Sequence, residues 1–264
     1  MPFAQLFGGS SASRPARVPA GMRVYAVGDI HGRDDLLAEL VERIEAEIRD
    51  HPARSHMLVI LGDLIDRGPD SKGVVERLRT LRIPTLRTAL LAGNHEEALL
   101  RLLDGDDTLV ADWLRFGGSE CLASYGVDPA TLRSMRNSEA ARTVRRAIPP
   151  EHAAFVRRFG DTLQIGGYLF VHAGIRPGIP LARQTQSDLR WIRRPFLDDE
   201  RDHGFIVVHG HTISDGVDEA VNRIGIDTGA YCSGILTALV LEGDQRRYIQ
   251  TGGQKPVSRP GFET

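Results

Sequence analysis

Five short polar segments of this sequence combine glycine with side chains that can bind metal ions or phosphate. Each follows an apolar stretch, and each contains aspartate, histidine, asparagine or arginine. A single segment of this kind is explained as a turn, because Gly and Asp are common in turns. Five segments that agree indicate one shared site. The polar residues are Asp29, His31, Asp63, Asp66, Arg67, Asn94, His95, His172 and His211.

These residue types point to metal chemistry. Carboxylate together with imidazole is the ligand set of Mn²⁺, Fe and Zn²⁺, whereas a Ca²⁺ site built of oxygen atoms alone would not use the histidines. One ion needs about four to six ligands, some of them water. Six good protein ligands, one of them a carboxylate able to bridge, therefore indicate two ions. Two ions form a clamp for in-line attack on phosphorus or on a carbonyl carbon.

Arg67 and His95 narrow this chemistry to phosphate. A guanidinium group matches phosphoryl oxygens in a two-pronged hydrogen bond, which favours a phosphoryl group over a carbonyl. His95 directly follows Asn94 and is placed to protonate a leaving alkoxide, provided that a carboxylate fixes its tautomer. Asp66 is the spare carboxylate for this purpose.

Strands and helices alternate in the first part of the chain, and the polar segments lie between them. The pattern predicts strand, charged loop and helix three times in succession. This order is typical of an α/β fold whose functional groups gather at the carboxyl ends of the strands. The predicted strands cover residues 22–28, 56–61 and 85–91, and the predicted helices cover residues 33–50, 71–81 and 97–103.

The middle of the chain, residues 104–159, has a different pattern. It is polar and predicts short helices broken by Gly and Pro, which we interpret as a cap inserted into the domain. Strand-like segments then return, beginning with "TLQIGGYLFVHAG", so we expect a single domain over residues 22–250. Residues 1–21 predict a loose leader, and residues 251–264 predict a similar tail.

The bulk composition is that of an ordinary globular protein. The chain has 264 residues, a formal net charge of −2, and 41% hydrophobic and 26% charged residues, so no overall field attracts it to nucleic acid or to a membrane surface. Residues 1–21 do not show the continuous apolar stretch expected of a secretory signal, and no apolar run of the sequence approaches membrane-spanning length. Its two cysteines cannot form a disulfide framework, which fits a reduced, cytoplasmic location. We expect no nucleic-acid or membrane partner, and the sequence indicates no oligomeric state.

Taken in order, "GDIHG", "GDLIDRG", "GNHEE", "VHAG" and "VHGHT" resemble the motifs of the calcineurin-like metallophosphoesterases. More narrowly, they are similar to those of the PPP-type serine/threonine protein phosphatases in their bacterial and phage form, over about residues 23–241. The resemblance implies an α/β fold in which two mixed sheets form a central β-sandwich flanked by helices. Residues 104–159 would be a small helical cap insertion.

The resemblance also implies a role for each polar residue. His95 would be the general acid, oriented by Asp66, and Arg67 and Asn94 would bind the substrate phosphate. Two divalent ions are expected, Mn²⁺ on the family resemblance, with Fe and Zn²⁺ also compatible with the ligands. The implied metal ligands are Asp29 and His31 on the first ion, Asp63 as the bridge, and Asn94, His172 and His211 on the second.

A second arginine reaches the phosphate in this family, from the loop after the His-Ala-Gly motif. The segment "SDLRWIRRPF" resembles that region. Arg193 is our choice, with Arg190 and Arg194 as open alternatives. In "VHGHT" we expect His211 rather than His209 to be the metal ligand.

These roles favour a metal-dependent phosphoprotein phosphatase. It would hydrolyse serine and threonine phosphomonoesters of a phosphoprotein or phosphopeptide, with phosphotyrosine as a further substrate. The reaction implied by the resemblance is direct attack of a metal-bridging hydroxide, without a phosphoenzyme. A binding protein without activity would need a damaged metal or phosphate set, and this set is complete.

The alternative is a nucleotide hydrolase of the same superfamily, similar to the symmetrical dinucleoside tetraphosphatases. Those enzymes typically lack the counterpart of Asp66 and carry Asp in place of Glu96. Both residues therefore favour the protein phosphatase over the nucleotide hydrolase. The cap would shape the substrate pocket and could reverse this preference.

Overall fold

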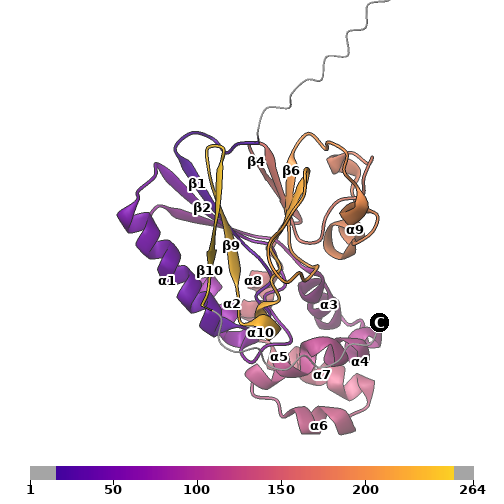
Figure 1. Ribbon diagram of the computed structural model, residues 1–264. Coiled ribbons are helices and arrows are strands. Elements are labelled where there is room, and N and C mark those ends of the chain that lie inside the picture. Colours follow the sequence, from indigo (N-terminus) through magenta and orange to yellow (C-terminus); the bar gives the residue numbers. More distant parts are fainter. Residues whose placement is uncertain (1–15, 253–264) are drawn as a thin grey trace, which may run out of the picture.

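Two five-stranded sheets form the centre of the molecule. The computed structural model describes residues 16–252, and both sheets mix parallel with antiparallel strands (Figure 1). The first sheet has the order β10 (Gln245–Gln250), β9 (Thr237–Glu242), β1 (Met22–Val27), β2 (Ser55–Ile60) and β3 (Leu86–Leu90). The second has the order β4 (Thr162–Ile165), β5 (Tyr168–Val171), β6 (Ile206–His209), β8 (Arg223–Gly225) and β7 (Asp218–Glu219).

The alternation of side chains along β1 explains how the layers pack. Successive residues of a strand point to opposite faces of the sheet. Val24 and Ala26 belong to the core between the two sheets, together with Phe170 of β5. Tyr25 and Val27 belong to the core on the other face, which the helices cover. A strand buried on both faces reads as a nearly continuous apolar run, as "VYAV" does.

Helices cover the outer faces of both sheets, and the predicted α/β sandwich of two mixed sheets flanked by helices is confirmed (Figure 1). On the second sheet, Leu169 and Val207 pack with Leu189 of α9 (Gln186–Trp191). On the first sheet, the covering helices are α1 (Asp34–Asp50), α2 (Ser71–Thr80) and α3 (Asn94–Leu103).

Residues 104–159 form the expected group of short helices beside α3 (Figure 1). Val110 and Val144 of this cap are buried in the same core as Leu99 and Leu102 of α3. The cap therefore shares the main hydrophobic core and has none of its own. Its elements are η1 (Asp107–Leu109), α4 (Val110–Trp113), the π-helical turn η2 (Leu114–Gly118), α5 (Ser119–Ser124), α6 (Pro129–Ser134), α7 (Asn137–Ala147) and α8 (Pro150–Val156).

The packing at both ends of the domain differs from the expected leader and tail. Val18 is buried between the sheets, and its backbone N–H donates to Gly243 O at 2.9 Å. Thr251 is also buried, and its Oγ1 accepts from Leu236 N at 2.8 Å. A lone valine among Pro and Arg gives no periodic signal, which explains the error at residues 16–21. The rest of the predicted leader and tail, residues 1–15 and 253–264, lies outside the described residues.

Several short elements were not predicted because two to six residues carry too little hydrophobic period to detect. Within residues 16–252, none of the helices combines the length and the apolar character that crossing a membrane requires. The unpredicted elements are η3 (Leu181–Arg183), α9, η4 (Phe196–Asp198), β7, α10 (Ala230–Ser233) and β10.

Candidate active site

Loops at the carboxyl ends of the strands bring the predicted site residues together. The loops after β1 and β2 and the start of α3 supply those of the first sheet, and His172 and His211 follow β5 and β6 of the second. These loops turn sharply: of the six described non-glycine residues with positive φ, five are predicted site residues. Backbone strain of this kind clusters at functional sites. The five are His31, Asp63, Asp66, Arg67 and His211.

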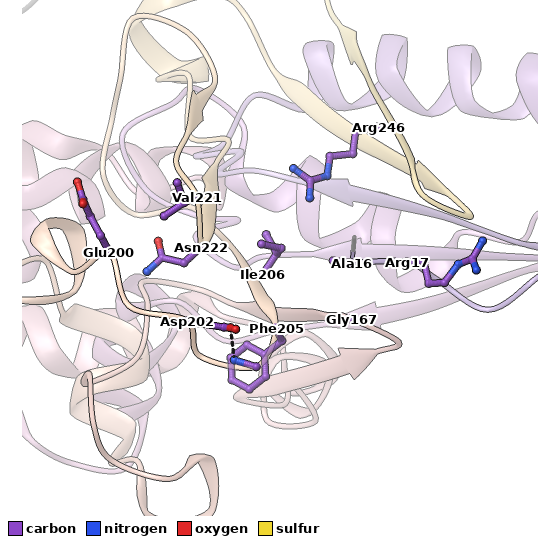
Figure 2. A pocket seen from close by; sticks show the side chains of 11 residues that line it. Ala16, Arg17, Gly167, Glu200, Asp202, Phe205, Ile206, Val221, Asn222 and Arg246 are labelled. Atoms are coloured by element: carbon purple, nitrogen blue, oxygen red, sulfur yellow. Dashed lines mark hydrogen bonds between the residues drawn. The ribbon is translucent and has the colours of Figure 1, made fainter. Parts of the chain in front are cut away.

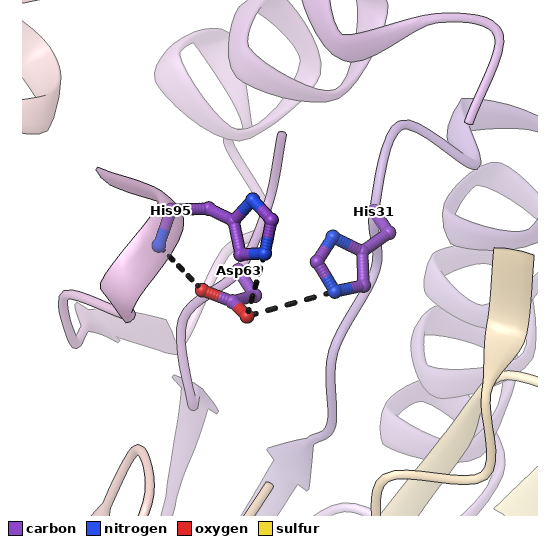
Figure 3. A group of neighbouring side chains, drawn as sticks. All are labelled: His31, Asp63 and His95. Atoms are coloured by element: carbon purple, nitrogen blue, oxygen red, sulfur yellow. Dashed lines mark hydrogen bonds and ion pairs between the residues drawn. The ribbon is translucent and has the colours of Figure 1, made fainter. Parts of the chain in front are cut away.

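Asp63 lies at the centre of the site. Its Oδ2 is 3.5 Å from His31 Nε2, 3.5 Å from His172 Nε2 and 3.9 Å from His95 Nε2. Figure 3 shows the carboxylate facing both His31 and His95. The Asp63 side chain is 2% exposed, so water screens this cluster of nitrogen and oxygen atoms very little.

Two groups of metal-binding side chains share Asp63. One comprises His31, Asp63 and His95, and the other comprises Asp63, His172 and His211, with the donor atoms of each group within 4.8 Å of one another. Asn94 joins the second group, because its Oδ1 is 3.0 Å from both His172 Nε2 and His211 Nδ1. A carboxylate common to two groups is the arrangement that two neighbouring ions require.

Backbone carbonyls prepare two of the histidines for metal binding. His31 Nδ1 lies 2.8 Å from Ile65 O, and His172 Nδ1 lies 2.9 Å from Leu61 O. A proton held on Nδ1 by a carbonyl leaves the lone pair of Nε2 free, and in both rings Nε2 faces Asp63. A hydrogen bond from the other ring nitrogen to a backbone carbonyl is typical of metal-ligating histidine.

The balance of buried charge also fits cations at this position. Burial, together with the charges of Asp227 and Asp63, raises the pKa of Asp29. Burial opposes the charge of Asp63 as well, but the imidazole of His172 and those of three further histidines lower the pKa of Asp63 below its ordinary value. Buried carboxylates are stable when they are paired or coordinate metals. The nitrogen and oxygen donors therefore fit two divalent ions and do not select among Mn²⁺, Fe and Zn²⁺.

Asp29, which the resemblance placed on the first ion with His31, lies beside His211 and in neither group, and its role as a metal ligand stays a prediction. Both of its carboxylate oxygens accept the backbone N–H of His211 at 3.1 Å. Asp227, which the sequence analysis missed, is its buried neighbour. Burial and the nearby charge of Asp63 raise the pKa of Asp227 to about 6, and its Oδ1 accepts from Gly229 N at 3.0 Å. The segment "GIDTGA" carries the same signal as the other loops, an aspartate beside glycine after a strand.

Asp66 holds His95, as the resemblance implied. Its Oδ2 lies 2.6 Å from His95 Nδ1 and also accepts the indole Nε1–H of Trp113 at 2.8 Å. Burial lowers the pKa of His95, but the charge of Asp63 and the hydrogen bond to Asp66 more than offset it, so the pKa is raised. Trp113 could not be predicted, because nothing in the sequence of the cap shows which side chain points toward Asp66.

Glu96 shapes the loops of the site. Its carboxylate accepts three backbone N–H groups, from Asp63 and Leu64 at 2.8 Å and from Gly93 at 2.9 Å. Burial and the charge of Asp63 raise the pKa of Glu96 to about 7. These bonds tie the loop after β2 to the start of α3, and they place Asp63 beside Asn94 and His95.

Arg67 lies over the metal-binding groups. Its guanidinium nitrogens lie 3.0 Å from His31 Nε2 and 3.1 Å from His95 Nε2, and the group lies 5.1 Å from the ring centroid of Tyr231. Two adjacent donors at this point match the oxygens of a phosphoryl group. Its assignment to phosphate stays a prediction.

The three candidate arginines after β5 differ in their surroundings. Arg193 lines a cavity together with Arg67 and His211. Arg190 is ion-paired with Asp161 at 2.6 Å. Arg194 is 82% exposed and pairs with Asp198. These placements favour Arg193.

His209 lies outside both metal-binding groups. Its Nδ1 is 3.0 Å from Gly210 O, and its ring packs edge-on against Phe196.

Two cavities of the described structure are candidates for the substrate-binding site. The cavity beside His95 has a volume of about 440 Å³ and extends along α3 to the cap. A larger one, of about 680 Å³, is lined by Gly167, Ile206 and Arg246 (Figure 2). Gly167 precedes β5 and Ile206 begins β6, so this second cavity lies at the end of the sheet opposite the catalytic loops. Only the first cavity contains predicted site residues.

The family model described as calcineurin-like phosphoesterase matches residues 22–234. The chain belongs to this family. The two histidine–aspartate groups are consistent with its dinuclear metal centre, and the protein is a metal-dependent phosphoesterase.

Related proteins cover nearly the whole chain. The symmetrical bis(5'-nucleosyl)-tetraphosphatase of Dechloromonas aromatica strain RCB is 29% identical, over 85% of this chain and 94% of that protein. A crystal structure of a candidate diadenosine tetraphosphatase has a TM-score of 0.63 and 23% identity, and covers 90% of this chain and 98% of its own. A cold-active protein tyrosine phosphatase has a TM-score of 0.55 and 18% identity, with 88% and 81% coverage. At these identities, the two structures show that the fold is shared.

Proposed function

We propose that the protein is a metal-dependent hydrolase of dinucleoside tetraphosphates that cleaves them symmetrically. The similarity to the tetraphosphatase of Dechloromonas aromatica, over most of both chains, carries the choice of substrate. The paired groups on Asp63 support hydrolysis at phosphorus. The comparisons thus favour the nucleotide hydrolase over the protein phosphatase that the sequence analysis preferred. The substrate would be a small nucleotide and not a phosphoprotein.

The two residues that favoured a protein phosphatase do not face the substrate cavity. Asp66 and Glu96 are fully buried, and neither lines the cavity beside His95. Glu96 holds backbone N–H groups, and Asp66 holds His95 and Trp113. Both roles serve a phosphoryl-transfer site with any leaving group. Glu96 therefore does not decide between a nucleotide and a phosphopeptide, and Asp66 bears on that choice only through the general acid that it holds.

The residues of the chain divide the work of hydrolysis. Divalent ions held by the groups around Asp63 would neutralise phosphoryl charge and lower the pKa of bound water. Arg67 and Arg193 would bind the phosphoryl oxygens that lie in the cavity. His95 would give the proton on Nε2 to the oxygen that leaves phosphorus, while Asp66 keeps the other proton on Nδ1.

A protein phosphatase is the second candidate, and the intact pair of His95 and Asp66 is the observation that favours it. Hydrolysis of phosphoserine releases an alkoxide, which needs a proton from a general acid. Cleavage in the middle of a tetraphosphate releases a nucleoside diphosphate, a far weaker base that needs this proton less. A general acid held this firmly suits either reaction, but only the hydrolysis of phosphoserine depends on it strongly.

Product analysis tests the proposal. The full chain, loaded with Mn²⁺, is incubated with diadenosine tetraphosphate, and the products are separated by anion-exchange chromatography. We expect ADP as the sole nucleotide product, with no cleavage after the metal has been removed by a chelator. AMP and ATP in equal amounts would contradict symmetrical cleavage. An intact substrate in the presence of metal would contradict the substrate class.

A further inference from the structure

The cavity beside His95 extends well beyond the reaction centre. Arg67, Asn94 and His211 lie at one end of it, and Glu97 and Arg101 of α3 line its wall. Its volume of about 440 Å³ is within the range of pockets that bind small molecules. It therefore has room for a part of the substrate that does not react.

Exposed aromatic rings distinguish this cavity from the rest of the described surface. Large hydrophobic side chains that are exposed singly are normal on proteins. Here, however, the exposed large hydrophobic side chains of the described residues include two aromatic rings, and both line this one cavity. Phe116 is 47% exposed and Trp191 is 45% exposed. Phe116 comes from the cap and Trp191 from the end of α9, two segments far apart in the sequence. Their convergence next to the catalytic residues indicates a ligand with a flat apolar surface.

Polar contacts hold both rings in place. The indole Nε1–H of Trp191 donates to Glu97 Oε2 at 3.3 Å, and Arg190 donates to the same oxygen at 3.3 Å. The guanidinium of Arg115 lies 4.8 Å from the centroid of the Phe116 ring. Rings fixed before the ligand arrives lose less entropy when it binds.

The charges along the cavity match a nucleotide. Arg67 and Arg193 lie at the end that holds the metal-binding groups, where a polyphosphate would react. The carboxylates of Glu97 and Asp112 line the same cavity and can accept hydrogen bonds from the amino group of a base. Every nucleobase has a π face that stacks on aromatic side chains. A phosphoserine or phosphothreonine side chain has no such face.

We propose that this cavity binds the nucleobase and ribose of one half of the substrate, with the base lying against Trp191 and Phe116. This inference rests on the proposed function, since it names the part of a dinucleotide that the cap side of the site recognises. The cavity accommodates one nucleoside, so the other half of a symmetrical substrate would lie outside it.

Binding of two ligands that differ only by a nucleoside tests the inference. ADP and inorganic pyrophosphate are titrated by calorimetry into the full chain with Mn²⁺, as wild type and as Trp191→Ala, Phe116→Ala and Phe116→Leu variants. We expect wild type to bind ADP more tightly than pyrophosphate. Each change to alanine should weaken ADP binding by about 5- to 150-fold, the range for loss of one stacked aromatic ring, and leave pyrophosphate binding unchanged. Phe116→Leu, which keeps an apolar side chain beside the turn, should lose ADP affinity too.

Val221→Ala is the matched control, because Val221 is a 75% exposed apolar residue that lines the other cavity. It should leave both ligands unaffected. Tryptophan fluorescence gives a second readout, since the chain has two tryptophans and Trp113 is buried. ADP should quench the emission of wild type, and the Trp191→Phe variant should lose this response.

Three results would overturn the inference. The first is equal binding of ADP and pyrophosphate to wild type, and the second is equal losses for both ligands in the aromatic variants. The third is weakened binding of a phosphoserine peptide, titrated under the same conditions as a third ligand, with ADP binding unaffected. The hydrolysis of diadenosine tetraphosphate is measured separately. ADP selectivity that depends on both rings, without any cleavage, would support the base site and contradict the proposed function. Cleavage of diadenosine tetraphosphate without any effect of the two rings on ADP binding would support the proposed function and contradict the base site.

Discussion

The indole Nε1 of Trp113 donates to Asp66 Oδ2 at 2.8 Å, and the same carboxylate oxygen lies 2.6 Å from His95 Nδ1. Trp113 belongs to the cap, whereas Asp66 and His95 belong to the loops of the first sheet. The cap thus holds the carboxylate that orients the expected general acid. A second bond joins the same parts, because Arg67 N donates to Gly117 O at 3.1 Å.

Trp113→Phe is expected to lower kcat by about tenfold, since it removes one hydrogen bond to a buried charged group while an aromatic ring still fills the space. Metal content and melting temperature should change little. Steady-state kinetics and elemental analysis check this. Trp191→Phe is the control, because it removes the other indole, and it should raise KM with kcat unchanged. A kcat for Trp113→Phe equal to wild type would mean that the bond to Asp66 is only structural.

His95→Asn is expected to affect substrates according to their leaving groups. With an alkyl phosphomonoester, turnover should fall by about 10²–10⁴-fold, as is typical when a general acid is lost. With diadenosine tetraphosphate the loss should be smaller, because a diphosphate leaves with less need for a proton. The two kcat values, measured on one metal-loaded preparation, give the comparison. Equal losses on both substrates would assign His95 a role other than proton transfer.

Asp63→Asn is expected to lower the metal content at both positions, since Asp63 belongs to both metal-binding groups. Inductively coupled plasma mass spectrometry after dialysis against Mn²⁺ should find about two ions per wild-type chain and well under one per variant chain. Asp104→Asn provides the control, because this exposed carboxylate pairs with Arg157 on the surface. Retention of two ions in Asp63→Asn would remove Asp63 as the bridge.

Gly117→Ala tests the link between the cap and Arg67. Gly117 has a φ of 114°, and a Cβ at this position would collide with the backbone nitrogen and Cγ of Arg67. We expect the variant to raise KM and to lower the free energy of unfolding by more than the strain of about 1–3 kcal/mol that the backbone conformation alone imposes.

Gly105→Ala separates these two effects. Gly105 has a φ of 102°, but no atom lies within 4 Å of a Cβ built there. It should therefore show the strain without the change in KM. Kinetics and chemical denaturation of both variants give the comparison, and identical behaviour would show that Gly117 matters only for its backbone conformation.

The architecture and most of the candidate site could be predicted from the sequence because strand, polar loop and helix alternate. Carboxyl ends of neighbouring strands meet at one edge of a sheet, so Asp29 and Asp63 could be placed together without a structure. His172 and His211 required the further step that a second sheet faces the first, which the family resemblance supplied.

Other parts could not be predicted, for identifiable reasons. Trp113 is 47 residues from Asp66, and its direction depends on how the cap packs onto α3. Asp227 carries the same strand-end signal as Asp29, so a stricter reading of "GIDTGA" would have found it. The substrate preference drawn from Asp66 and Glu96 was weak because both side chains are fully buried and neither lines the cavity beside His95.

The most direct test of the proposed function is the ratio of two values of kcat/KM. Metal-stripped protein is reloaded with Mn²⁺, and hydrolysis of diadenosine tetraphosphate and of a phosphoserine peptide is measured on the same preparation. We predict that kcat/KM is higher for the dinucleotide by at least about two orders of magnitude, as expected when a site binds a substrate group that the competitor lacks. A higher value for the phosphopeptide would contradict the proposed function and favour the protein phosphatase.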